Sequence, residues 1–214
     1  MSNSSTKAKS GPRGSTKRPG KAGAGAPKPA LIAIGVGFAL LFAAFVAFTS
    51  NKPLQTPPSI GGPFQLTAHN GQQMTEKDLL ERPFLVFFGY THCPDICHTT
   101  LFEMSEILRA LGPQAKIAAL FVTVDPERDP PAVLKEYLSN FDPRIIGLTG
   151  PRDALDPMLK EYRIYSKRTP GEGEDYSVDH TTIVYLMDKN GHFVSTFNVA
   201  RKPADAAREL QRHL

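Results

Sequence analysis

The sequence predicts an α/β sandwich with a mixed central sheet, and three observations support this fold class. Continuous apolar runs at 83–90 and 116–125 have the length and composition of strands buried on both faces. Amphipathic helical patterns alternate with such runs along the chain. Asn-Gly pairs at 70–71 and 190–191 each separate two short apolar segments, as in β-hairpins. Strands that alternate with helices and end in a hairpin are typical of this architecture.

The N-terminal residues 1–29 differ sharply from the rest of the chain. They contain seven of the 25 basic residues and no Asp or Glu, and most of the others are Ser, Gly, Pro and Ala. Such a segment cannot bury a core, so a disordered, basic, cytoplasmic tail is expected. The remaining residues carry 18 basic and 21 acidic side chains, a net charge near −3. No basic face therefore remains to bind nucleic acid.

Residues 30–49 carry no charge and are apolar on every side of a helix. At about 1.5 Å per residue, such a helix spans roughly 30 Å, the thickness of the hydrocarbon core of a bilayer. A buried core helix would have a polar side, and a cleaved signal peptide would have a shorter apolar stretch and a clean A-x-A site. We therefore expect an uncleaved transmembrane anchor, with the N-terminus in the cytoplasm and the C-terminal domain outside.

The Pro-rich residues 50–60 are predicted to be a linker, and 61–214 to form one folded domain with a single core. The domain should open with a hairpin at 64–75 and the buried strand at 83–90. A helix is expected from about Pro94 to Leu111, ended by Gly112. The remaining predicted elements are a strand at 116–125, a helix at 130–141 with Asp129 as its N-cap, a strand at 144–150, a helix at 151–166, a hairpin at 181–197 and a closing amphipathic helix at 202–214.

The only two cysteines, Cys93 and Cys97, lie where the first buried strand gives way to this helix. Residues four apart on a helix share a face, with Cβ atoms about 6 Å apart, so both sulfur atoms can point at one position. Pro94 suits the first helical position, and the free N–H groups there should stabilise a thiolate. This edge of the sheet is also where α/β proteins keep their ligand sites.

Three interpretations of the cysteine pair compete: a structural disulfide, a redox dithiol and half of a metal site. A disulfide that closes a five-residue loop constrains the unfolded chain little, so it would add little to the stability of the fold. The choice between redox and metal chemistry depends on a third residue. His180 precedes a predicted strand, and if that strand pairs with 83–90, its imidazole would complete a Cys2His site. A surface-loop histidine satisfied by water remains the alternative for His180.

The other five histidines are weaker candidates. His92 and His98 flank the thiols, and His98 is expected to face away from Cys97. His69 and His192 lie in predicted hairpin turns, and His213 lies near the C-terminus. Solvated polar residues are ordinary at such positions. Beyond the ligands, Tyr90 and Asp95 are predicted to orient them or to shape the loop. In the segment DPERD, Asp125 and Asp129 suit helix N-caps, with Arg128 paired to one of them, and Asp125 is also a candidate for supporting the ligands.

The segments GYTHCPDIC, VTVDPERD and VDHTTIVYLMDKNGHF, in this order behind one predicted anchor, resemble the Sco/SenC family over residues 60–214. These are membrane-tethered copper proteins of cytochrome c oxidase assembly with a thioredoxin-like fold. The resemblance implies that Cys93, Cys97 and His180 are copper ligands. It also implies that the domain delivers copper to the binuclear copper centre of oxidase subunit II, or reduces the cysteines of that subunit. One departure is His98, where the family pattern has Pro.

Ligand chemistry agrees with this resemblance. Soft thiolates select Cu(I), and imidazole accommodates both Cu(I) and Cu(II). The spacing is C-x-x-x-C rather than the C-x-x-C of redox enzymes, which favours metal binding. We therefore expect a copper metallochaperone and not an enzyme. The alternative is a membrane-tethered thiol–disulfide oxidoreductase with Cys93 as nucleophile and Cys97 as resolving thiol, and a peroxidase on the same scaffold is a third option.

The expected location is the bacterial inner membrane, with one transmembrane pass and a periplasmic C-terminal domain. The mitochondrial inner membrane, with the domain in the intermembrane space, is the alternative. The Gly- and Pro-rich tail makes a poor amphipathic transit helix, which favours the bacterial location. The partners implied are cytochrome c oxidase subunit II, other periplasmic copper chaperones and the membrane itself.

Overall fold

The computed structural model describes two compact units, Met1–Leu54 and Gln55–Leu214. The described residues are 37, 40–46, 59–171 and 176–214. In the first unit, residues 37 and 40–46 are helical and exposed. Within the described ranges, no helix has both the length and the apolar character needed to cross a membrane. The predicted tail lies wholly, and the anchor and linker mostly, outside these ranges, so all three stay predictions.

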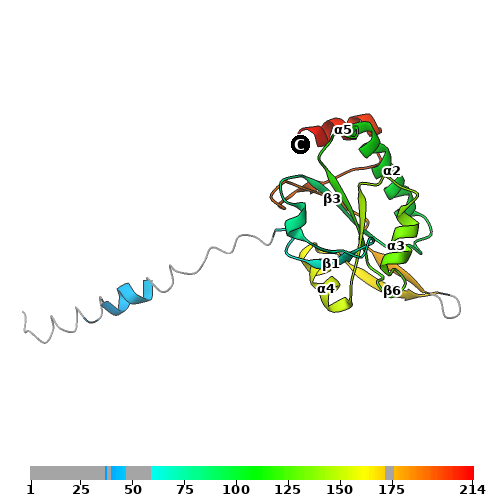
Figure 1. Ribbon diagram of the computed structural model, residues 1–214. Helices are drawn as coiled ribbons and strands as arrows, with labels where there is room; N and C mark the ends of the chain where they lie inside the picture. The colour runs from blue at the N-terminus through cyan, green and yellow to red at the C-terminus, as the bar shows by residue number, and fades with distance from the viewer. Residues whose placement is uncertain (1–36, 38–39, 47–58, 172–175) are drawn as a thin grey trace, which may run out of the picture. The chain divides into compact units, whose positions relative to one another are not determined.

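The second unit is built around a mixed sheet of seven strands. These are β1 (Gln65–Ala68), β2 (Gln73–Thr75), β3 (Phe84–Gly89), β4 (Ala118–Thr123), β5 (Ile145–Thr149), β8 (Val184–Met187) and β9 (Phe193–Thr196). Their order in the sheet is β2-β1-β5-β4-β3-β8-β9 (Figure 1). β3, β4 and β5 run parallel, and the other neighbours pair antiparallel. The predicted mixed sheet and both predicted hairpins are confirmed.

Helices cover both faces of this sheet. They are η1 (Glu76–Leu79), α2 (Ile96–Leu111), α3 (Pro131–Leu138), α4 (Arg152–Glu161) and α5 (Pro203–Gln211). Side chains alternate along β3: Phe84, Val86 and Phe88 belong to the core that contains α4. Leu85 and Phe87 belong to the core shared with α2, α3 and α5. A strand with a core on each side must be apolar throughout, which explains the continuous run at 83–90.

The pairing of β8 with β3 brings the His180 region to the cysteines. The two strands are antiparallel, with Val184 opposite Phe87. The chain just before β8 therefore lies beside the end of β3, where the cysteine segment starts. The polar stretch before β8 forms a hairpin rather than a surface loop. β6 (Ser166–Pro170) and β7 (Tyr176–His180) pair as a separate two-stranded sheet, with His180 at the end of β7.

Two predicted helix starts are also corrected. α2 begins at Ile96 rather than Pro94, because the Cys93 N–H donates to the Tyr90 carbonyl at 3.3 Å and closes a turn first. α3 begins at Pro131, with Pro130 at the N-cap position in place of Asp129. The Asp129 side chain instead accepts hydrogen bonds from Thr123 of β4 and from Thr91 in the loop before Cys93.

Candidate metal centre

Cys93, Cys97 and His180 converge on one position. The two sulfur atoms and one imidazole nitrogen all lie within 4.8 Å of one another. Cys97 Sγ lies 3.6 Å from His180 Nε2, although 83 positions separate these residues in the sequence. Both cysteines are free thiols. The residues that sequence reasoning selected are therefore brought together, in an arrangement suited to holding a single metal ion.

Cys97 is held in place by tight packing at the end of β3. Its side chain is fully buried, whereas Cys93 is partly exposed. A Cβ atom added to Gly89 would lie only 2.8 Å from Cys97 Sγ and 2.7 Å from the Phe121 ring. The glycine therefore lets the sulfur sit directly against the strand. The sequence marks Gly89 as a strand end, but nothing in it shows that a thiol occupies the missing side-chain volume.

The His180 ring is oriented with Nε2 toward the thiols. Its Nδ1 lies 3.0 Å from the Thr181 carbonyl oxygen, so Nδ1 carries the proton and donates. Nε2 is then left with a free lone pair that faces Cys97. Hydrogen bonding of the remote ring nitrogen to a carbonyl is the usual way in which proteins orient a metal-binding histidine.

Desolvation favours the neutral form of both the fully buried Cys97 thiol and the half-buried His180 imidazole. Desolvation raises the pKa of the Cys97 thiol well above its usual range, and the neighbouring Cys93 adds to this increase. Desolvation lowers the pKa of His180, although its hydrogen bond to Thr181 opposes this. The thiol is thus protonated and the imidazole neutral near pH 7. The expected thiolate stabilisation by the helix N-terminus is outweighed by burial at Cys97.

Tyr90 lies beside His180, one of the candidate ligands. Its ring meets the His180 ring edge-on, with centroids 5.7 Å apart. Its hydroxyl oxygen accepts a hydrogen bond of 3.2 Å from the Val178 N–H in β7. Burial raises the pKa of the Tyr90 hydroxyl, so the phenol stays neutral. Tyr90 therefore connects the end of β3 to the strand that carries His180.

Asp95 and Asp125 make contacts close to the candidate ligands without joining them. Asp95 is exposed and its carboxylate accepts a hydrogen bond from the Thr99 hydroxyl at 3.3 Å, so it shapes the start of α2. Asp125 is fully buried and pairs with Arg128, as the sequence predicted, but it also accepts from the Tyr176 hydroxyl at 2.8 Å. Neither carboxylate belongs to the three-residue ligand group.

The other histidines lie outside the ligand group. His98 is exposed on α2 and packs its ring against Phe141, which confirms that it faces away from Cys97. His92 is exposed and its Nδ1 contacts the Thr91 hydroxyl at 3.0 Å. His69 Nδ1 accepts a hydrogen bond from the Gly147 N–H at 2.9 Å and so helps to hold the first hairpin on the sheet.

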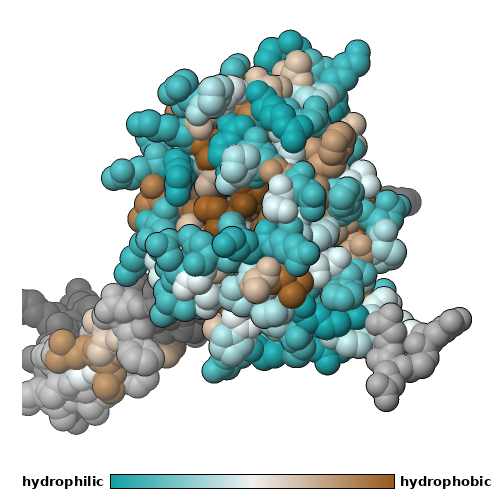
Figure 2. Space-filling view, turned by 45° about the vertical axis from the view of Figure 1, so that its right-hand side comes forward, coloured by the Kyte–Doolittle hydropathy of each residue, from teal (hydrophilic) through white to brown (hydrophobic). Residues whose placement is uncertain are grey.

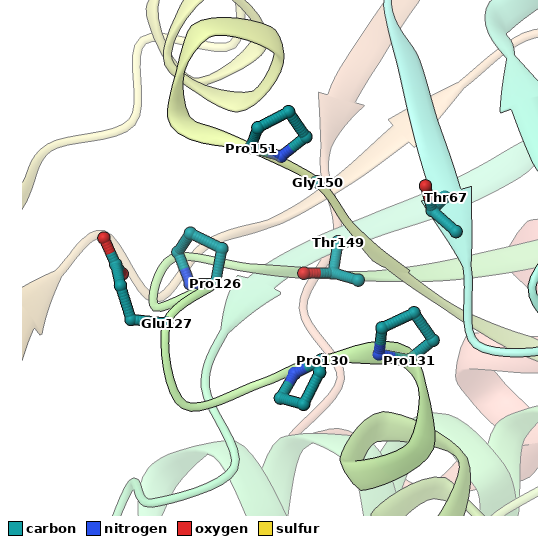
Figure 3. A pocket seen from close by; sticks show the side chains of 8 residues that line it. All are labelled: Thr67, Pro126, Glu127, Pro130, Pro131, Thr149, Gly150 and Pro151. Atoms are coloured by element: carbon teal, nitrogen blue, oxygen red, sulfur yellow. The ribbon is translucent and has the colours of Figure 1, made fainter.

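An open pocket of about 380 Å³ exposes the candidate centre to solvent. Its lining residues are Tyr90, Cys93, Pro94, Asp95, Ile96, Ser177, Val178, Asp179, His180 and Thr182. A different pocket, of about 320 Å³, is shown in Figure 3 and contains none of the three candidate ligands. Its lining residues are Thr67, Pro126, Glu127, Pro130, Pro131, Thr149, Gly150 and Pro151. Only the first pocket gives a partner access to Cys93.

Sequence reasoning missed the importance of Tyr176 and Thr91. Tyr176 begins β7 and contacts the buried Asp125, and Thr91 precedes Cys93 by two residues and contacts the buried Asp129. Neither tyrosine nor threonine is unusual at such positions. The signal that was available is the segment DPERD, whose two aspartates require partners if they are buried.

Comparison with known proteins identifies the family. The SCO1/SenC family model matches residues 52–214. The mitochondrial SCO1 homolog of Mus musculus is 40% identical over 161 residues, which are 73% of this chain and 57% of the relative. SCO1 of Saccharomyces cerevisiae is 47% identical over 141 residues, 64% of this chain and 48% of the relative. The chain thus spans about half the length of these mitochondrial relatives.

The match covers a larger share of a bacterial relative and of two solved structures than of the mitochondrial relatives. The SCO2-like protein of Rickettsia felis is 35% identical over 191 residues, 85% of this chain and 93% of the relative. Copper-bound ScoI of Bradyrhizobium japonicum is 54% identical, with a TM-score of 0.71 over 73% of this chain and 100% of its own. Copper-bound yeast Sco1 is 41% identical, with a TM-score of 0.67 over 73% of this chain and 88% of its own. The expected thioredoxin-like fold is confirmed, and the chain belongs to the SCO1/SenC family.

Proposed function

We propose that this protein is a copper metallochaperone whose ligands are Cys93, Cys97 and His180. The observation that carries the proposal is the convergence of two free sulfur atoms and one imidazole nitrogen within 4.8 Å. Relatives from Bradyrhizobium japonicum and yeast have been solved with copper bound, which supports copper as the cargo. Copper is carried and passed on, so the protein is a binding protein rather than an enzyme with turnover.

The donor set suits copper in both of its common oxidation states. Two thiolates are soft ligands that favour Cu(I), and imidazole is compatible with Cu(I) and Cu(II). The orientation of His180 fits this role, because its Nε2 lone pair faces Cys97 while Nδ1 is bonded to the Thr181 carbonyl. The three side chains come from a loop, a helix and a strand end, so the ligand set forms only in the folded domain.

Transfer by ligand exchange explains why only three protein ligands are needed. The pocket beside Cys93 leaves room for a ligand from the recipient. An incoming thiolate can bond to copper before a bond to Cys93 breaks, so the oxidation state of the metal does not change in the step. Ile96 and Ile183 are exposed close in sequence to Cys97 and His180, and supply apolar surface for a docking protein.

The proposed recipient is the binuclear copper centre of cytochrome c oxidase subunit II, with other periplasmic copper chaperones as further partners. The family resemblance supports this assignment. The apolar, uncharged residues 30–49 support a single transmembrane anchor in the bacterial inner membrane with the copper domain in the periplasm. The Rickettsia relative supports a bacterial setting, and the mouse and yeast relatives support the mitochondrial inner membrane as the alternative.

A thiol–disulfide oxidoreductase is the second candidate function. It is favoured by a specific asymmetry: Cys93 is partly exposed and Cys97 is buried, as in a dithiol with an attacking and a resolving sulfur. Such an activity would act on the cysteines of subunit II or of another exported protein. It needs both thiols but has no use for the His180 lone pair.

The substitution His180→Ala separates the two functions. We expect copper affinity to fall at least roughly 100-fold, the upper end of the loss seen when even an outer partner of a metal ligand is removed. Dithiol oxidation should persist, since both sulfur atoms remain. His192→Ala is the control, because His192 is largely exposed beside Asp188. Unchanged copper affinity in His180→Ala would contradict the metallochaperone site.

A further inference from the structure

Residues 125–129, the DPERD turn, contact both segments that carry the candidate ligands. Neither buried carboxylate of this turn, Asp125 or Asp129, belongs to the ligand group. A buried carboxylate is costly unless it is paired and hydrogen-bonded. The partners of Asp125 and Asp129 are on the two segments that carry the ligands, which gives this turn a role beyond joining β4 to α3.

Asp129 holds the loop that leads to the cysteines. One carboxylate oxygen accepts from the Thr91 N–H at 3.0 Å and from the Thr123 hydroxyl at 2.6 Å. The other oxygen accepts from the Thr91 hydroxyl at 2.6 Å. Thr123 is the last residue of β4, and Thr91 is two residues before Cys93. Asp129 thus fixes the cysteine loop to the neighbouring parallel strand.

Asp125 and Arg128 hold the hairpin that carries His180. The Tyr176 hydroxyl donates to Asp125 at 2.8 Å, and Arg128 Nη1 donates to the Tyr176 carbonyl at 3.0 Å. The Arg128 guanidinium also lies 3.7 Å from the centroid of the Tyr176 ring. Arg168 in β6 adds a contact of 3.5 Å to Asp125. Both strands of the hairpin are therefore attached to the turn.

These attachments matter because strand pairing does not join the β6–β7 hairpin to the seven-stranded sheet. β6 and β7 form their own two-stranded sheet, separate from the seven-stranded one. Tyr176 and His180 are the two ends of β7, so a displacement at Tyr176 is carried along the strand to the imidazole. The contact of Val178 with Tyr90 is a second attachment, halfway along the same strand.

We propose that the DPERD turn is a two-sided clamp: Asp129 positions the thiols through Thr91, and Asp125 with Arg128 positions the imidazole through Tyr176. These are positioning residues, since they touch ligand-bearing segments and not the ligands. The inference rests on the proposed copper site. It predicts that the two sides can be weakened separately, so that one variant loses the nitrogen ligand and another disturbs the sulfur ligands.

Tyr176→Phe tests the imidazole side. It removes the hydroxyl that binds Asp125 and keeps the ring that lies against Arg128. In the purified full-length chain loaded with Cu(II), we expect loss of the nitrogen hyperfine coupling and an affinity lower by roughly 10- to 100-fold. Sulfur-to-copper charge-transfer absorption should remain. Tyr165→Phe is the matched control, because Tyr165 is exposed at the start of the same hairpin.

Thr91→Val tests the thiol side. It removes one hydroxyl bond to Asp129 and keeps the side-chain shape. We expect a weaker sulfur-to-copper absorption band with the nitrogen coupling retained. Thr67→Val is its control, since that hydroxyl accepts only a surface hydrogen bond from Gln73 among the described residues. Circular dichroism of each variant confirms that the fold is kept.

The outcomes separate the clamp from the copper site itself. A wild-type chain without both sulfur and nitrogen signals would contradict the proposed site. A wild-type chain that has both signals, with Tyr176→Phe and Thr91→Val indistinguishable from it, would overturn the clamp alone. Equal loss of both signals in each variant would also overturn it, because the two carboxylates would then support the centre as a whole and not its separate halves.

Discussion

The buried Cys97 thiol must lose a proton before it can bind copper as a thiolate. Desolvation raises the pKa of this thiol, so it is protonated near pH 7 in the metal-free protein. Desolvation lowers the pKa of His180, so the imidazole is already neutral there and releases no proton on binding. At the scale of single residues, copper binding and proton release are therefore coupled through sulfur and not through nitrogen.

This coupling predicts a pH dependence of copper affinity. At least one proton, from Cys97, is released per copper ion bound, so the binding constant should rise at least about tenfold for each unit of pH between 6 and 8. Competition titrations at pH 6, 7 and 8 measure this slope. An affinity that is independent of pH over this range would contradict the protonated state of the Cys97 thiol.

Gly89 gives a second prediction at the residue scale. Gly89→Ala places a methyl group 2.8 Å from Cys97 Sγ and 2.7 Å from Phe121, so the sulfur must move. We expect a loss of about 1–3 kcal/mol in the free energy of unfolding, as for other overpacked cores, together with a weaker copper site. Urea denaturation and copper titration measure the two effects.

Gly147→Ala is the matched control for this substitution. Its added methyl group would lie 2.6 Å from a Leu138 methyl group, and neither cysteine is among its nearest neighbours. It should cost a similar amount of stability and leave copper affinity unchanged. If Gly147→Ala weakened copper binding as much as Gly89→Ala, the effect would be one of general stability and not of the cysteine position.

At the scale of elements, Asp142 and Arg144 tie α2 to the strand β5. The Asp142 N–H donates to the Ser105 hydroxyl in α2, and Arg144 Nη1 donates to the carbonyl of Gly112 at the helix end. The two side chains pair at 2.7 Å, with Asp142 almost fully buried. This tie fixes the C-terminal end of the helix whose first turn contains Cys97.

Asp142→Asn tests the tie through its pH dependence. Burial alone would raise the pKa of Asp142, but hydrogen bonds from the Arg144 side chain and backbone outweigh it, so the pKa is lowered. The resulting stability is present above the unfolded pKa of 3.8 and is lost as pH falls through the lower folded value. We expect the variant to be about 1–3 kcal/mol less stable at pH 7.

Urea denaturation at pH 7 and below pH 3 measures this difference. It should shrink at the lower pH, where the wild-type carboxylate is itself becoming protonated. Asp156→Asn is the control, because Asp156 is exposed and its contact with Arg152 is 3.7 Å long; an effect within about 0.5 kcal/mol is expected. A difference that is the same at both pH values would show that the charge of Asp142 is not what stabilises the tie.

Sequence patterns predicted the elements that have a strong apolar period, and the ones they missed have none. β3, β4 and α2 are defined by buried faces, and on α2 both Leu101 and Met104 are fully buried. β6 and β7 contain mostly polar residues, which are exposed or only partly buried. They are held by pairing with each other and by contacts to the DPERD turn, which are long-range effects that a local pattern does not contain.

The candidate ligands were predictable because thiols and imidazoles are rare and strand order restricts where they meet. The positioning residues were not, because a Tyr or Thr becomes informative only when its partner in space is known. Asp125 and Asp129 were interpreted as helix N-caps from local sequence alone. Their burial against Tyr176 and Thr91 shows that tertiary contacts override that local preference.

At the scale of the whole molecule, only small areas of the surface are apolar enough to favour docking of another protein. Figure 2 shows a face that is largely hydrophilic, with hydrophobic residues gathered in small areas. Residues 30–214 carry 18 basic and 21 acidic side chains, so no strong field of one sign dominates. If the proposed copper delivery is correct, recognition of the recipient should depend on the surface near the candidate metal centre and less on long-range charge.

The redox state of the whole domain should control copper loading. A disulfide between Cys93 and Cys97 leaves no thiolate to bind metal, so the oxidised protein should take up little Cu(I). The reduced protein should bind one Cu(I) ion per chain. Anaerobic titration of the two forms with Cu(I), followed by metal analysis, measures this. Equal uptake by both forms would contradict binding through the thiols.

The central claim is that one copper ion binds to two sulfur atoms and one imidazole nitrogen. Metal analysis and X-ray absorption of the purified, copper-loaded full-length chain test it most directly. The account predicts one copper per chain with both sulfur and nitrogen neighbours, and loss of the nitrogen in His180→Ala. A sulfur-only spectrum that is unchanged by His180→Ala, or copper with only oxygen and nitrogen neighbours, would contradict it.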